Sequence, residues 1–108
     1  MTHYADFAAD QYMRSVLREE FTSAESDNAL TALSTLTGLF PGLFPIDRTF
    51  ARPDYQRGSE RALGVRFVVY GPEGIERTVR VPRAALASLE GIVDETLTVV
   101  YGLSQAAA

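Results

Sequence analysis

Cysteine and lysine are both absent from this 108-residue sequence, and histidine occurs once, as His3. Without cysteine there can be no disulfide, thiolate metal site or cysteine nucleophile. Without lysine there can be no Schiff-base chemistry and no P-loop lysine. This single histidine lies in an N-terminal segment that is expected to fray, so neither a histidine-based catalytic triad nor a multi-histidine metal site can be built. We therefore expect a protein that is not an enzyme and that holds no metal or cofactor.

Long apolar runs are also missing, since no stretch approaches the roughly 18 apolar residues of a membrane span. Residues 1–6 lack the basic region and apolar run of a signal peptide. We therefore expect a cytoplasmic protein with no membrane partner. All ten basic residues are arginine, a bias that we attribute to GC-rich coding in a bacterium or its phage. A net charge of −4 and a pI near 4.9 argue against a general DNA-binding surface.

The length and the 46% hydrophobic content fit one domain with one core. We predict a single compact α+β domain over residues 1–108, with flexible ends at 1–3 and 104–108. Its expected order is two helices paired as a hairpin, a long loop, an antiparallel β-hairpin and a C-terminal helix.

The helix hairpin is predicted from apolar spacing and from capping signals. Residues 4–21 place apolar side chains three and four positions apart, which is typical of an amphipathic helix. A second helix starts either at the capping box that Thr22 and Glu25 could form or at residues 26–28. It is expected to close at Gly38 in a left-handed cap.

The β-hairpin is predicted at residues 63–70 and 75–81, which are rich in β-branched and aromatic residues and flank a Gly/Pro turn at 71–74. One face is apolar and must be covered by helices, whereas Arg66 and Arg80 lie on the other. The edge left over could be protected by these arginines or could receive a partner strand.

Two structures fit the C-terminal part. A helix beginning near Pro82 would place Leu86, Leu89 and Val93 at helical spacing. The alternative is a short helix closed by Gly91 and then a strand over residues 96–101, where β-branched residues are frequent.

The most individual feature is the tandem Gly-Leu-Phe-Pro unit at residues 38–45, whose glycines and prolines prevent continuous helix or strand. Its large apolar side chains either form a buried lid over the helix pair, the more common fate in a small domain, or serve as an exposed anchor for a partner. We predict a partner-binding site there, with arginines and a tyrosine around it. Its residues are Leu39, Phe40, Leu43, Phe44, Arg48, Arg52, Tyr55 and Arg57.

Residues 46–61 show no sustained period and are expected to form a loop that could include a short edge strand. This segment interleaves arginines with Phe50 and Tyr55, a combination that can stack bases and contact phosphates. The adjacent acids Glu19-Glu20 and Asp94-Glu95 point in different directions on a helix and suit a solvated surface better than catalysis.

These features predict a non-enzymatic module that binds a protein partner stoichiometrically, as an adaptor, inhibitor or assembly component, and that can form a homo-oligomer. The alternative is binding of RNA or single-stranded nucleic acid through the Arg/aromatic loop.

Overall fold

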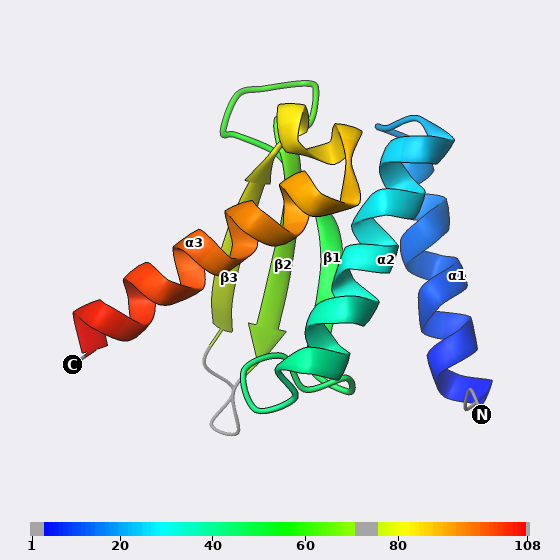
Figure 1. Cartoon of the computed structure of the whole chain (residues 1–108). Helices are drawn as coiled ribbons and strands as arrows, with labels where there is room; N and C mark the ends of the chain where they lie inside the picture. Colours follow the sequence, from blue (N-terminus) through cyan, green and yellow to red (C-terminus); the bar gives the residue numbers. More distant parts are fainter. Residues whose placement is uncertain (1–3, 71–75, 108) are drawn as a thin grey trace.

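A computed structural model describes the backbone of residues 4–70 and 76–107, and the side chains of residues 11–70 and 76–100. It confirms the α+β class and the predicted order of helices, strands and C-terminal helix (Figure 1). The predicted hairpin turn at 71–74 lies outside the described residues. Among those that are described, no helix is long and apolar enough to cross a membrane. The elements are α1 (Tyr4–Arg18), α2 (Ser23–Leu39), β1 (Thr49–Asp54), β2 (Gly64–Tyr70), β3 (Glu76–Pro82), the 3-10 helix η1 (Arg83–Ala87) and α3 (Leu89–Ala107).

Helices α1 and α2 form the predicted antiparallel pair (Figure 1). The first of the two proposed start signals is the one used: the Thr22 hydroxyl accepts the Glu25 N–H, and the Glu25 carboxylate accepts the Thr22 N–H. The predicted left-handed cap at Gly38 is wrong. Phe40 is the C-cap, at φ −129°, because its N–H still donates to the Leu36 carbonyl and keeps the last turn helical.

The sheet has three antiparallel strands in the order β1-β2-β3, so it extends the predicted hairpin by one strand. β1 occupies the segment expected to be mainly loop, where an edge strand was one of the options. Ala51 pairs with Phe67, and Phe67 pairs in turn with Val79. This register was not visible from the sequence, because residues 46–61 contain too few apolar side chains to show a clear alternation.

The core lies between one face of this sheet and the helices α2 and α3, which cross in front of it in Figure 1. We call this side of the sheet the helix face and the other side the open face. Strand alternation sends every second side chain to the helix face. Its buried apolar residues are Ala51, Val65, Phe67, Val69, Val79 and Val81.

The outer edge of β1 is closed by α1 and by a proline. The Ala51 N–H points away from β2 and donates to Met13 Sδ of α1 at 3.3 Å. Pro53, two residues further and therefore on the same edge, has no N–H to offer. Both features prevent another strand from pairing with β1.

The third helix begins later than predicted and excludes the alternative strand over 96–101. Pro82 ends β3, η1 follows, and Ser88 caps α3 by accepting the Gly91 N–H at 3.0 Å. The hydroxyls of Thr96 and Thr98 donate to the carbonyls four residues before them, which accommodates β-branched residues in a helix. α3 continues through Ala107, and Ala108 lies outside the described residues.

Candidate binding surfaces

The structure divides the tandem Gly-Leu-Phe-Pro segment between core and surface. Phe44 is 2% exposed and belongs to the core, and Phe40 packs against that core. The Phe40 carbonyl accepts the N–H groups of Leu43 and Phe44 at 3.0 and 2.8 Å, which turns the chain tightly. Phe44, which we predicted at a partner-binding surface, is therefore part of the core in this structure.

The two leucines of the segment point outward. Leu39 is 65% exposed and Leu43 is 49% exposed, and the nearby Ile46 is 67% exposed. We call Leu39, Leu43 and Ile46 the apolar tip. Sequence reasoning missed Ile46, although an apolar residue between Pro45 and the charged Asp47 could have marked it as a continuation of the segment.

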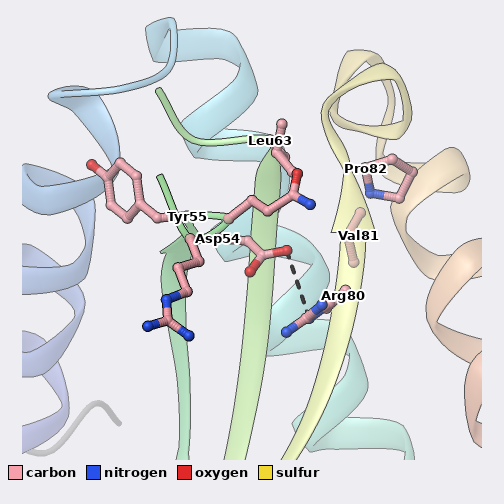
Figure 2. Close-up of a pocket in the computed structure, with 8 residues that line it drawn as sticks. Asp54, Tyr55, Leu63, Arg80, Val81 and Pro82 are labelled. Carbon is pink, nitrogen blue, oxygen red and sulfur yellow. Dashed lines mark ion pairs between the residues drawn. The ribbon is translucent and has the colours of Figure 1, made fainter. Parts of the chain in front are cut away.

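The predicted charged rim does not surround the apolar tip. Arg48 does lie beside it, because its N–H donates to the Pro45 carbonyl at 3.0 Å. Arg52 instead lies on β1 at the open face. Tyr55 and Arg57 follow the far end of β1 and line a hollow there (Figure 2). Of the predicted site, the structure therefore brings Leu39, Leu43 and Arg48 together at the surface, with Phe40 half-buried beside them.

A second surface gathers on the open face. Arg52 is paired with Arg66, and Arg66 is paired with Arg80, so the three strands present one arginine each at the same level. We call these three residues the arginine row. Arg52 and Arg80 are exposed and Arg66 is half-buried. The sequence had placed Arg66 and Arg80 on the same wet face, but Arg52 joins them only through the β1 register.

Two aromatic rings lie on the same face. Phe50 precedes Arg52 by two residues, and its ring meets that of Tyr70 edge-on with centroids 6.2 Å apart. Both are half-buried, and Val68, which pairs with Phe50, is fully covered. Val68 is outside the main core cluster, so these neighbours form a small separate apolar layer on the open face.

A pocket of about 380 Å³ lies beside the arginine row, and Arg80 is one of the residues that line it. Figure 2 shows Asp54 and Arg80 reaching toward each other across β2, and their ion pair measures 3.9 Å. The ion pair runs diagonally across β2, because Asp54 pairs with Gly64 whereas Arg80 pairs with Arg66, two residues further along the strand. A Cβ at Gly64 would lie 2.0 Å from the Val81 carbonyl oxygen, so glycine is required for the close approach of β2 and β3.

Tyr55, one of the predicted site residues, is used in a structural contact. Its hydroxyl donates to Glu20 at 2.7 Å, while the second Glu20 oxygen accepts the Ala62 N–H at 3.2 Å. These bonds lower the pKa of the Glu20 carboxyl and raise the pKa of the Tyr55 phenol. Arg83 completes the connection: it donates to the Glu20 carbonyl and lies 4.8 Å above the Phe21 ring.

The fold and these surfaces define an α+β protein with a three-stranded antiparallel sheet covered by helices on one face. No protein-family model, curated protein or solved structure significantly matches the chain. Within the described part of the chain, no three acidic or histidine side chains are grouped so that they could hold a metal ion.

Proposed function

We propose that this chain is a non-enzymatic binding module that holds a protein partner stoichiometrically through the apolar tip. The observation that carries the proposal is the exposure of Leu39, Leu43 and Ile46 on a turn whose neighbouring phenylalanines pack inward. Such a turn presents apolar side chains without needing to become ordered on binding, which reduces the entropic cost of association.

The size of the tip sets the strength of the contact. Each aliphatic side chain gains about 1.5–3 kcal/mol on full burial from full exposure. Because the three tip residues are already partly covered, together they contribute about 4 kcal/mol, which alone corresponds to a dissociation constant of about 1 mM. A stable complex therefore needs further contacts around the tip, and the adjacent Arg48 supplies a cation. The partner that fits is a protein with an apolar pocket and a carboxylate at its rim.

The test compares two surfaces of similar chemistry. Leu43→Asp combined with Ile46→Asp removes the tip, while Leu63→Asp changes a leucine of nearly equal exposure, 51%, at the opposite end of the sheet. Tagged wild type and both variants are incubated with lysate of a GC-rich bacterium, and the retained proteins are quantified by mass spectrometry. We expect at least one captured protein that wild type and Leu63→Asp bind equally well and that the tip variant binds at least 100-fold more weakly, a loss of about 2.7 kcal/mol of binding free energy.

Sedimentation of the purified wild type and tip variant covers the case in which the partner is a second copy. A dimer of the wild type that becomes a monomer in the tip variant would assign the tip to self-association. Retention of every captured protein by the tip variant, together with an unchanged oligomeric state, would refute a binding role for the tip.

A further inference from the structure

The arginine row brings three like charges together with little compensation. Like charges directly opposite each other in a sheet are destabilising. Within the described residues, Arg52 and Arg66 have no ion pair, and the Nε of Arg66 is buried without a hydrogen-bond acceptor. Arg80 reaches Asp54 at 3.9 Å with a side chain that is 75% exposed, which is a weak pair. The row therefore offers unused donors to an anion lying across the sheet.

The length of the row favours a polymer over a small anion. Neighbouring strands are about 4.8 Å apart, so three arginines on three strands span about 10 Å. A single phosphate or carboxylate cannot reach all three backbone positions at once, whereas a chain with repeated negative groups can. Among the described residues, the three arginines of the row outnumber the two carboxylates that the strand register places on the open face, Asp54 and Glu76, in a chain whose net charge is −4.

The neighbouring rings select the kind of polymer. Phe50 lies two residues from Arg52 on the same face, about 7 Å along the strand, and contacts the Tyr70 ring. This places aromatic surface at the distance at which a nucleotide carries its base from its phosphate. An acidic peptide would satisfy the arginines but would make no use of the rings. We infer that the open face binds single-stranded nucleic acid, with phosphates on the arginine row and bases on Phe50 and Tyr70.

The surface involved is separate from the apolar tip, so the inference stands or fails independently of the proposed protein partner. It also makes a quantitative statement about salt. Binding of a single strand weakens with salt concentration at a log–log slope of about −0.7 for each phosphate neutralised. Three arginines on three phosphates therefore predict a slope of about −2. So small a number of phosphate contacts does not require the large excess of basic residues that the acidic chain lacks.

The experiment measures fluorescence anisotropy of a labelled twelve-nucleotide oligouridylate and of the matching oligothymidylate, between about 50 and 200 mM NaCl. Two further probes are a duplex of the same length and a twelve-residue polyglutamate peptide. We expect both single strands to bind with the slope given above, and the duplex and the peptide to bind at least tenfold more weakly.

Paired variants test which residues act. Arg52→Ala with Arg80→Ala should weaken binding of the single strands at least tenfold and bring the slope close to −0.7, the value for one remaining contact. Arg77→Ala is the matched control, because Arg77 is an exposed arginine of β3 that pairs with Val69 of the helix face. It should change the affinity less than twofold. Phe50→Leu keeps an apolar side chain but removes the ring, and should weaken binding about tenfold with the salt slope unchanged.

Three results would overturn the inference. The first is an absence of single-strand binding at the lowest salt concentration. The second is polyglutamate binding as tight as that of the single strands, which would identify an acidic protein segment as the ligand of this face. The third is an Arg77→Ala loss of binding free energy that reaches half of the double variant's loss or more, which would show that the affinity follows the number of charges removed and not the arginine row.

Discussion

The two faces of β2 carry different kinds of side chain, although they belong to the same seven-residue strand. Val65, Phe67 and Val69 enter the core under α2 and α3. Arg66 and Tyr70, which alternate with them, lie half-buried on the open face. In this sheet the buried side chains of the helix face stabilise the fold, whereas the open face carries arginines that contribute little to the stability.

Such a division lets stability and binding be changed separately. Substitutions on the helix face should lower the free energy of unfolding through cavities or clashes. Those on the arginine row should leave that free energy unchanged or raise it, because they relieve repulsion between like charges.

The largest effect is expected on the helix face. Phe67→Ala removes a fully buried ring between α2 and the sheet and should lower the free energy of unfolding by about 4 kcal/mol in urea titrations. Arg66→Ala, one residue away on the other face, should change it by no more than about 0.5 kcal/mol. Equal losses in the two variants would break the distinction between the faces.

A second prediction concerns the contact between the central strand β2 and its neighbour β3. Gly64→Ala would place a methyl group 2.0 Å from the Val81 carbonyl oxygen and should cost about 3 kcal/mol, because β2 and β3 must separate to accept it. Gly42→Ala is the control, since nothing lies within 4 Å of its added Cβ. Thermal unfolding of both variants measures the difference. A stable Gly64→Ala would mean that the strands are not as close as the structure places them.

The open face should show the opposite sign. Arg52→Thr with Arg80→Thr keeps residues that suit a strand and leaves Arg66 as the last cation of the row. The free energy of unfolding should rise by about 0.5 kcal/mol at low salt, and the gain should disappear at about 1 M NaCl, where charges are screened. A loss of stability at low salt would show instead that the pair of Arg80 with Asp54 outweighs the repulsion.

The smallest effect lies at the end of the sheet, outside both faces. Folding lowers the pKa of Glu20 because Tyr55 and the Ala62 N–H donate to its carboxylate. The stability from this group is therefore complete above its ordinary pKa of 4.5 and is lost as the pH falls through the lowered value. Glu20→Gln should make unfolding less dependent on pH in this acid range, as urea midpoints at a series of pH values would show. If the urea midpoint of Glu20→Gln falls with decreasing pH as steeply as that of the wild type, other carboxylates control the stability in acid.

Much of the fold could be predicted from local patterns. The capping box at Thr22 and the alternation in β2 and β3 depend on neighbours a few residues apart. The alternation was identified correctly, and the capping box was one of the two helix starts that the sequence left open. The late start of α3 was missed, because Pro82 can begin a helix as readily as it can end a strand. β1 was at most suspected, because Phe50, Arg52 and Asp54 form an alternating pattern only once Ala51 and Pro53 are known to be buried.

The candidate surfaces were harder to predict than the elements. In the tandem segment both leucines are exposed and both phenylalanines turn inward, although a turn rich in glycine and proline could have oriented either pair toward the core. Of the polar residues predicted around this segment, Arg48 lies beside the apolar tip, whereas Tyr55 lies elsewhere and donates a hydrogen bond to Glu20.

The sequence by itself determined the first two helices and the two strands of the β-hairpin, because helix and strand periods and capping are set by residues close along the chain. It also determined that the groups for lysine and cysteine chemistry are missing. Only the tertiary structure decided that Arg52, Arg66 and Arg80 stand in one row and that Phe44 is core while Leu43 is surface. The physical reason is that strand register and burial depend on pairing between distant segments, and a shift of one residue would send every side chain of β1 to the other face.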